Sequence, residues 1–447
     1  MTRTAHRGAI AHMLADPARV GAVEAHAYFP DGLLVVEDGH VADIGDFATL
    51  APRLPAATPV IHHRNALIVP GFVDSHVHFP QTDIIAGYGV QLLDWLERYA
   101  FPAEAAFADA GHAHHAAEFF LDELLRNGTT TAMVFGTVHR VSVEALFAAA
   151  FKRNMRLVAG KVLMDRNAPS ALLDTAASGE AESRALIAAW HGKGRLGYAV
   201  TPRFAPTSSS EQLRRAGQML ADHPDVMMQT HLAENAREIA WVASLFPEAR
   251  DYLDVYAKAG LLTGRALFAH GVHLKDGELA RLAKAGAAIA FCPTSNLFLG
   301  SGLFDLNAAE RHGVTVGLGT DIGGGTSFSL LATANEAYKV CQLKGHSLDP
   351  FKAFYLATLG GAEALRLAAK IGNLRPGKEA DFLVLDMAAT PLMARRMAAC
   401  RDLAERLFVL AMLGDDRTVK YTYVAGALAH ARDGRKATDD HAAPHRA

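Results

Sequence analysis

Cysteine is scarce in this sequence, whose 447 residues contain only Cys292, Cys341 and Cys400. Three scattered cysteines cannot build a disulfide framework, and no two of them have the Cys-x-x-Cys spacing of redox or metal-binding pairs. The sequence therefore excludes a disulfide-stapled scaffold and suits a reducing compartment.

An excess of one charge and long apolar runs are also missing. The 44 Lys and Arg residues nearly balance 47 Asp and Glu, giving a formal net charge of −3, and no long basic run occurs. Nucleic acids and anionic membranes attract concentrated positive charge, so we expect neither as a partner and expect a small molecule instead. No uncharged apolar stretch reaches the ~18 residues of a membrane span, and His, Arg and Asp interrupt the apolar stretch of residues 1–20. We therefore expect a soluble cytoplasmic protein.

The middle of the chain has a regular alternation of two textures. Short runs rich in β-branched and apolar residues alternate with longer stretches rich in Ala, Leu and Glu, which is typical of repeated βα units. The expected strands are 71–77, 129–135, 156–163, 197–201, 227–230, 266–269, 287–291 and 315–319. Eight such units predict an α/β protein with a (β/α)₈ barrel of the TIM type.

Both ends of the chain have a different, purely β texture. The first segment contains the pieces 32–36 and 40–44 around an Asp-Gly turn, and the last contains 380–385, 419–424 and 427–430. Each end is too short to bury much alone, so we expect one small composite β-sandwich domain made of residues 1–69 and 373–447, and a barrel domain of residues 70–372. The polar tail from Arg432 onward is expected to be disordered.

Polar side chains with metal-binding and acid–base chemistry follow several predicted strands. His76 and His78 end the first strand, and their spacing puts both imidazoles on one face. A lone His-x-His pair is weak evidence among 22 histidines. Further candidates fall at the ends of other strands, namely His231, Glu234, His270 and Asp321. Because active sites of such barrels lie at the carboxyl ends of the strands, these residues should meet at one mouth, where imidazoles and a carboxylate favour zinc or iron(II).

Longer motifs resemble the guanine deaminase family of the amidohydrolase superfamily. The matching segments are Pro70 to His78 (PGFVDSHVH), HFPQ at 78–81, LLDWL at 92–96, FPAE at 101–104, GTTT at 128–131, TPRF at 201–204, HLAEN at 231–235, CPTSNL at 292–297 and GLGTD at 317–321. The resemblance implies a zinc-dependent barrel, a composite β-sandwich and a homodimer. It also implies that His76, His78, His231 and Asp321 are metal ligands and that Glu234 is the proton shuttle.

The chemistry of the residues supports these roles. Zinc lowers the pKa of a bound water toward about 7, and deamination then needs a proton carrier. Glu234 reaches the same site if the chain turns after His231, although a glutamate there also suits a helix cap. His270 is expected to hydrogen-bond to the attacking water or substrate, with direct ligation left open, and Asp321 to accept the proton of the water. We expect a single metal ion, because the fourth strand lacks the lysine that bridges two metals in superfamily relatives, and we expect Lys161 on the third strand to be structural.

Other residues match the positions that contact a purine in the guanine deaminase family. Arg203 carries only hydrogen-bond donors, which suit the O6 carbonyl of guanine, Phe204 offers a stacking face, and Gln81 has both donors and an acceptor. His231, Glu234 and Asp321 are also expected to contact the base. The segment 92–96 forms either a lid over the site or an ordinary amphipathic helix, and its periodicity does not decide between them.

Together these features predict hydrolytic deamination of guanine to xanthine and ammonia. The enzymatic alternative is another amidohydrolase-superfamily deaminase that acts on a modified purine or a pterin. The non-enzymatic alternative is a barrel that serves only as a scaffold, which the complete set of metal and acid–base positions disfavours.

Overall fold

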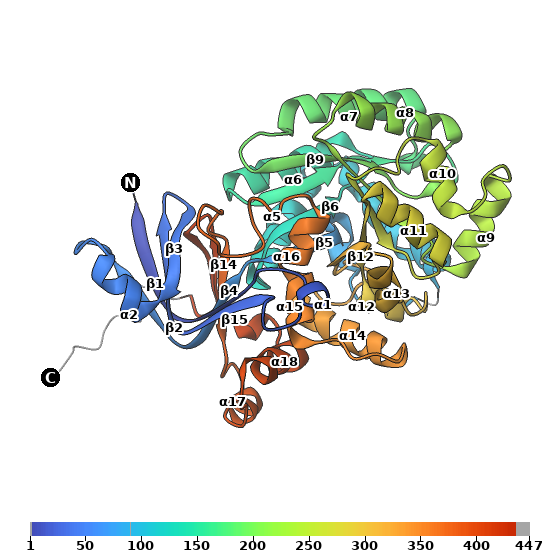
Figure 1. Ribbon diagram of the computed structural model, residues 1–447. Helices are drawn as coiled ribbons and strands as arrows, with labels where there is room; N and C mark the ends of the chain where they lie inside the picture. The colour runs from blue at the N-terminus through green and yellow to red at the C-terminus, as the bar shows by residue number, and fades with distance from the viewer. Residues whose placement is uncertain (1, 90, 435–447) are drawn as a thin grey trace.

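The computed structural model describes residues 2–89 and 91–434, and it consists of a β-sheet unit beside a barrel (Figure 1). The sheet unit combines strands from the two ends of the chain, which Figure 1 shows in blue and red side by side. The composite of both ends expected from the sequence is confirmed, whereas the domain boundaries at residues 69 and 373 stay a prediction. The predicted disorder concerns Arg432 onward, and residues 435–447 lie outside the described residues.

The barrel strands agree closely with the predicted ones. In spatial order from β5 to β13 they run β5-β6-β7-β9-β10-β11-β12-β13, with the short β8 paired to β9. Their bounds are β5 Phe72–His78, β6 Thr129–Phe135, β7 Arg156–Gly160, β8 Val162–Leu163, β9 Leu196–Pro202, β10 Met227–Leu232, β11 Ala266–His270, β12 Ala288–Phe291 and β13 Thr315–Leu318. All neighbouring pairs are parallel, as repeated βα units require. The (β/α)₈ barrel is confirmed.

Hydrogen bonds at the end of β13 and just beyond it join the last strand of the barrel to the first strand, β5. The hydroxyl of Ser75 donates to the carbonyl of Leu318 at 2.6 Å. The backbone N–H of Asp321 donates to the carbonyl of His76, and that of His78 donates to the carbonyl of Ile322. The barrel is therefore closed at the residues that carry the candidate site.

The core lies on both faces of the barrel strands. Met133 of β6 and Ala199 of β9 belong to the cluster inside the barrel, while their neighbours Val134 and Val200 pack outward against the helices. Strands covered on both faces read as continuous apolar runs, which explains why the sequence located them well.

Helices cover the outside of the barrel and the junction with the sheet (Figure 1). The α-helices are α1 Pro17–Val20, α2 Phe47–Leu50, α3 Leu92–Trp95, α4 Phe101–Ala105, α5 Ala110–Arg126, α6 Arg140–Lys152, α7 Ala176–Trp190, α8 Ser210–Asp222, α9 Ala236–Leu245, α10 Tyr252–Lys258, α11 Asp276–Ala285, α12 Pro293–Phe298, α13 Leu306–Arg311, α14 Leu330–Leu343, α15 Pro350–Ala357, α16 Leu359–Ala364, α17 Pro391–Met397 and α18 Leu403–Leu413. Short 3₁₀ or π turns are η1 Ala51–Arg53, η2 Phe79–Ile84, η3 Leu96–Ala100, η4 Ala106–Ala108, η5 Ser170–Leu172, η6 Ala205–Thr207 and η7 Asp416–Thr418.

The seven-stranded sheet has the order β16-β15-β14-β4-β1-β2-β3. Its strands are β1 Arg3–Met13, β2 His26–Glu37, β3 His40–Asp46, β4 Val60–Pro70, β14 Phe382–Asp386, β15 Val419–Val424 and β16 Ala427–Ala431. The sequence located five of them and did not assign β1 or β4. Buried histidines interrupt the apolar pattern of both: His6 of β1 and His63 of β4 face each other, with 3.0 Å between their ring nitrogens.

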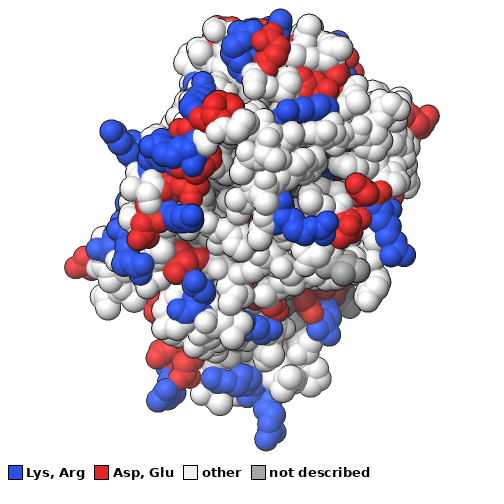
Figure 2. Space-filling model, turned by 90° about the vertical axis from the view of Figure 1, so that its right-hand side faces the viewer, with Lys and Arg blue, Asp and Glu red and all other residues white. Residues whose placement is uncertain are grey.

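The surface carries both signs of charge. Figure 2 shows Lys and Arg interspersed with Asp and Glu on one face of the molecule, without a broad region of one sign. Within the described ranges, no helix is both long enough and apolar enough to cross a bilayer.

Candidate active site

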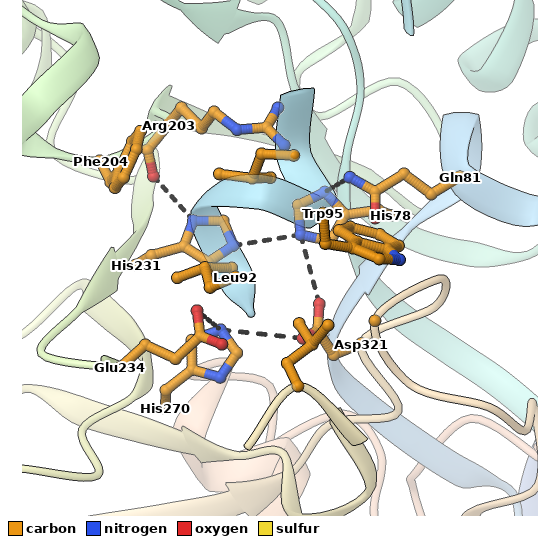
Figure 3. A pocket seen from close by; sticks show the side chains of 13 residues that line it. His78, Gln81, Leu92, Trp95, Arg203, Phe204, His231, Glu234, His270 and Asp321 are labelled. Carbon is orange, nitrogen blue, oxygen red and sulfur yellow. Dashed lines mark hydrogen bonds and ion pairs between the residues drawn. The ribbon is translucent and has the colours of Figure 1, made fainter. Parts of the chain in front are cut away.

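The predicted metal and acid–base residues meet at the mouth of the barrel, which we define as the carboxyl ends of its strands. Figure 3 shows His78, His231, Glu234, His270 and Asp321 around one cavity. His76 and His78 come from the end of β5, His231 from β10 and His270 from the end of β11. Asp321 follows β13 and completes the group. His231 is partly buried, and the other four side chains are buried.

The donor atoms of these residues are close enough to share one metal ion. One ligand atom each from His76, His231, His270 and Asp321 lie within 4.8 Å of one another. His78 belongs to the same cluster, because its Nε2 lies 3.2 Å from Nε2 of His231 and 3.4 Å from Oδ1 of Asp321. The structure thus brings together every predicted ligand and adds His270 as a further possible donor.

Several features fit this cluster to a metal. Nε2 of His76 and Nε2 of His270 are buried without a hydrogen-bond partner among the described residues. Buried polar atoms are rarely left unsatisfied without a functional reason. Imidazole nitrogens with one carboxylate are a donor set that zinc and iron(II) accept. The cluster is therefore able to hold a metal ion.

Neighbouring carbonyl oxygens orient two of the imidazoles. Nδ1 of His231 lies 2.7 Å from the backbone carbonyl of Arg203, and Nδ1 of His270 lies 2.9 Å from Oδ1 of Asn296. These acceptors hold a proton on Nδ1, so each Nε2 keeps a lone pair toward the cluster, as metal-binding histidines require. Burial lowers the pKa of His76 and of His231, which favours the neutral form that ligates metals.

Left-handed backbone conformations turn the side chains inward. The φ angle is 49° at Ala233, 70° at His270 and 51° at Asp321. Non-glycine residues rarely adopt such values, and they gather at functional sites. The turn at Ala233 brings Glu234 back toward His231, which is the condition that the sequence left open.

Glu234 lies within the cluster and does not cap a helix. Its Oε1 accepts a hydrogen bond from the hydroxyl of Ser301 at 2.9 Å, and its Oε2 lies 3.4 Å from Nε2 of His270. The following helix α9 is capped instead by Asn235 and Glu238. The alternative of a structural cap at Glu234 is therefore wrong. Burial raises the pKa of Glu234 to about 7, so that it is able to exchange a proton near neutrality.

Asp321 has the opposite electrostatic environment. Burial alone would raise its pKa, but the facing imidazoles of His76, His270 and His78 hold the pKa of the carboxyl well below its usual range. Its Oδ2 accepts a hydrogen bond from the hydroxyl of Ser295 at 2.5 Å. Two buried carboxylates of one site thus differ in basicity, which is typical of groups with separate acid and base roles.

One segment after β12 supports three of these side chains. Ser295, Asn296 and Ser301 bond to Asp321, His270 and Glu234, respectively. Sequence analysis noted the CPTSNL motif but assigned no contacts to it, because the three partners lie on three other strand ends.

The predicted purine-contacting residues line a cavity beside this cluster. The cavity encloses about 400 Å³ including its opening to solvent, and it is lined by His78, Gln81, Leu92, Trp95, Leu96, Arg203, Phe204, His231, Glu234, His270, Leu299, Asp321 and Gly324. Leu92, Trp95 and Leu96 belong to this lining, whereas Leu93 lines a separate hollow on the outside. Of the two readings of 92–96, the structure therefore favours the one in which this segment forms a wall of the site.

Glu104 is a buried residue of the site that ends the FPAE motif but to which sequence analysis assigned no role. Its carboxylate pairs with Arg203 and also accepts a hydrogen bond from Gln81. Lys161, by contrast, is buried in ion pairs with Asp174 and Glu182. These pairs account for the lysine as a structural residue, and β9 contains no lysine.

Several known proteins are similar to this chain in fold and in sequence. The model of the amidohydrolase family matches residues 67–429. The chain is 52% identical to guanine deaminase of Escherichia coli over 406 residues, which cover 91% of this chain and 92% of that protein. The E. coli guanine deaminase structure matches with a TM-score of 0.93 at 49% identity, covering 97% of this chain and all (100%) of the other. The guanine deaminase of C. acetobutylicum with bound guanine matches with a TM-score of 0.86 at 30% identity, covering 96% and 100%. The chain belongs to the guanine deaminase family of the amidohydrolases.

Proposed function

We propose that this protein hydrolyses guanine to xanthine and ammonia. One water molecule is consumed: its oxygen becomes bonded to C2 of the base, and the 2-amino group leaves as ammonia. The observation that carries the proposal is the adjacency of a cluster able to hold a metal ion, the buried carboxyl group of Glu234 and a cavity lined by Arg203 and Gln81. Membership of the guanine deaminase family supports the same reaction.

Guanine suits the chemistry of the cavity. Arg203 is buried and offers only donors, which match the O6 carbonyl and oppose the amino group that adenine carries at the same place. Phe204 and Trp95 contribute aromatic surface to the lining beside the planar base. The amino group to be removed and O6 lie on the same edge of guanine, on either side of N1, so a base held through O6 at Arg203 keeps C2 at a fixed place in the cavity.

The residues of the cluster supply binding and proton transfer. We propose His76, His78, His231 and Asp321 as ligands of one zinc ion per chain, with iron(II) as the alternative and His270 positioned to bind the attacking water. The bound ion would supply Lewis acidity that makes water nucleophilic near neutral pH. Asp321, ionised at the start because of its strongly lowered pKa, would take one proton from the attacking water, while Glu234 would protonate a ring nitrogen, recover the second water proton from the hydroxyl at C2 and pass it to the departing amine. The proton left on Asp321 would then restore Glu234.

The resemblance to the family supports a proposal for the oligomeric state, and the composition of the sequence supports one for the cellular location. We propose a homodimer in the cytoplasm, with the purine base as the small-molecule partner. A molar mass determined by light scattering tests the dimer, because a monomer would give the 47.8 kDa of the single chain.

Ammonia release from a panel of free bases tests the reaction. Guanine should react far faster than adenine or pterin, and 8-substituted guanines test the alternative of a modified purine. Arg203→Ala should lower kcat/KM for guanine roughly ten- to a hundredfold, the value of a lost charge-assisted hydrogen bond. Equal rates for guanine and adenine would favour the alternative of another deaminase of the superfamily. If no base released ammonia, the alternative of a non-catalytic scaffold would be favoured.

A further inference from the structure

A fully buried carboxylate lies behind the predicted specificity residues. Glu104 accepts hydrogen bonds from Nη1 of Arg203 at 2.8 Å on Oε1 and 2.6 Å on Oε2. Its Oε1 also accepts a hydrogen bond from Nε2 of Gln81 at 2.8 Å. The exposed fraction of Glu104 is 0%, and those of Arg203 and Gln81 are 2% each. A buried guanidinium needs such a partner, because an unpaired charge in the interior is strongly destabilising.

The contacts of Glu104 settle how the two donors face the cavity. Both hydrogen bonds from Arg203 use Nη1, so the other nitrogens of the guanidinium are not used by Glu104. The amide of Gln81 is held at both ends, because Nε2 donates to Glu104 while Oε1 accepts from the backbone N–H of Gly323 at 3.2 Å. Without Glu104, these contacts would no longer determine the rotation of the guanidinium, and the amide of Gln81 would keep only its contacts with Gly323 and with Nδ1 of His78 at 3.4 Å.

Glu104 comes from the same stretch of chain that covers the cavity. Helix α3, the turn η3 and helix α4 follow one another directly, and they place Leu92, Trp95 and Leu96 in the lining and Glu104 behind it. Phe101 of the same stretch contributes its ring to Arg203, with 5.4 Å from Cζ to the ring centroid. The cover of the cavity and the support of Arg203 are thus one structural unit.

We propose that Glu104 is a positioning residue for substrate binding, which acts through Arg203 and Gln81 and does not touch the base. This inference rests on the proposed function, since it presumes that guanine is the substrate. It assigns to Glu104 the binding of the base and not the proton transfers, because the hydrogen bonds of Glu104 reach neither Glu234 nor Asp321.

A double-mutant cycle tests the inference. Glu104→Gln keeps the volume of the side chain and removes its charge, and we expect KM for guanine to rise about tenfold or more while kcat stays within about threefold. In the Arg203→Ala background the same substitution should add little, because residues that act through one contact are not additive. Multiplicative effects of the two substitutions, or an unchanged KM in Glu104→Gln, would overturn the proposal.

Equilibrium binding gives a readout that is independent of chemistry. Xanthine carries the same C6 carbonyl and is not deaminated, so calorimetric titration with xanthine should show a weakening in Glu104→Gln similar to the rise in KM. Unchanged xanthine affinity would contradict the proposal.

Two further variants guard against trivial outcomes. Glu104→Asp keeps the charge and withdraws it by one methylene, so it should fold and show a smaller rise in KM; a KM equal to that of the wild type would count against positioning. Glu278→Gln on α11 changes another buried glutamate outside the cavity and should leave KM unchanged. If the wild type does not deaminate guanine at all, the proposed function fails, whereas a wild type that is active beside an unaffected Glu104→Gln refutes only the role of Glu104.

Discussion

The base of the barrel, where its strands begin, and the mouth, where they end, differ in how their charged and titratable side chains are paired. At the base, where the strands begin, Arg156 and Arg195 pair with Glu379, and Arg195 also pairs with Asp381 just before β14. Nε of Arg156 and Nε of Arg195 lie 2.8 and 2.9 Å from Oε2 of Glu379. At the mouth, Nε2 of His76 and Nε2 of His270 have no hydrogen-bond partner among the described residues, and they face the carboxylates of Asp321 and Glu234 at 3.2 and 3.4 Å. The charged groups at the base of the barrel form ion pairs with each other, whereas the imidazole nitrogens at the mouth remain available to bind a metal ion.

This difference separates structure from chemistry. A network whose members are all paired joins the barrel to the sheet, and nothing in it remains to bind a ligand. A cluster with unsatisfied lone pairs and carboxyl groups of shifted pKa is costly to fold, and it persists where it serves binding or catalysis. Substitutions of the acid–base residues at the mouth should therefore reduce activity without unfolding the protein, and substitutions in the ion-pair network where the strands begin should do the reverse.

Metal removal should have the largest effect at the mouth. Dialysis against a strong chelator should abolish deamination of guanine, and stoichiometric zinc should restore it, because the cluster provides one set of donors. Elemental analysis of the active protein should return one ion per chain. Two tightly held ions, or full activity after chelation, would contradict the single-metal site.

Loss of the proton shuttle should come next. Glu234→Gln keeps the shape and the acceptor for Ser301 but cannot transfer a proton, so kcat should fall about 10²–10⁴-fold. The melting temperature and the metal content should match those of the wild type. A variant that retained most of its activity would place the shuttle on another residue.

A substitution in the ion-pair network at the base of the barrel should lower the stability of the protein and leave its activity unchanged. Glu379→Ala leaves the buried Arg156 and the half-buried Arg195 with one carboxylate fewer, and removing one partner of such a network costs up to about 3 kcal/mol of the free energy of unfolding. Urea denaturation measures this loss, while kcat/KM of the folded fraction should stay near the wild-type value. A large fall in kcat/KM with unchanged stability would break the division between the two ends.

Acid should weaken the junction of barrel and sheet gradually. Nδ1 of His12 accepts a hydrogen bond from the backbone N–H of Leu374, with 3.2 Å between the two nitrogens. Burial lowers the pKa of His12 to about 4. The unfolded chain takes up this proton near pH 6.5, so His12 begins to oppose folding below that pH and reaches its full cost, about 3 kcal/mol, below pH 4. His12→Gln should flatten the fall in unfolding free energy between pH 6.5 and 5, with exposed His114→Gln as the control. An unchanged slope would show that His12 does not titrate in this way.

The barrel and most of the candidate site could be predicted because their signals are local. The barrel strands are almost continuously buried, and the residues of the site lie at the ends of these strands or just after them, so the barrel fold itself brings them together. The strands β1 and β4 were not assigned because His6 and His63 replace apolar residues in them, and their mutual contact is visible only once the strands lie side by side. Glu104 ends the FPAE motif, but its contacts could not be predicted, since its partners are 23 and 99 residues away in the sequence.

The closure of the barrel has a further consequence for its mechanical integrity. Asp74 and Thr320, which are hydrogen-bonded across the seam, are 246 residues apart in the sequence. Joining two points so far apart is entropically costly, although the cost grows only slowly with the length between them. The proposed ligands on either side of this seam, His76 and Asp321, would tie it together when they hold a common ion. The reaction centre would then also be the clasp of the barrel, and an ion lost from it would loosen the first and last strands together.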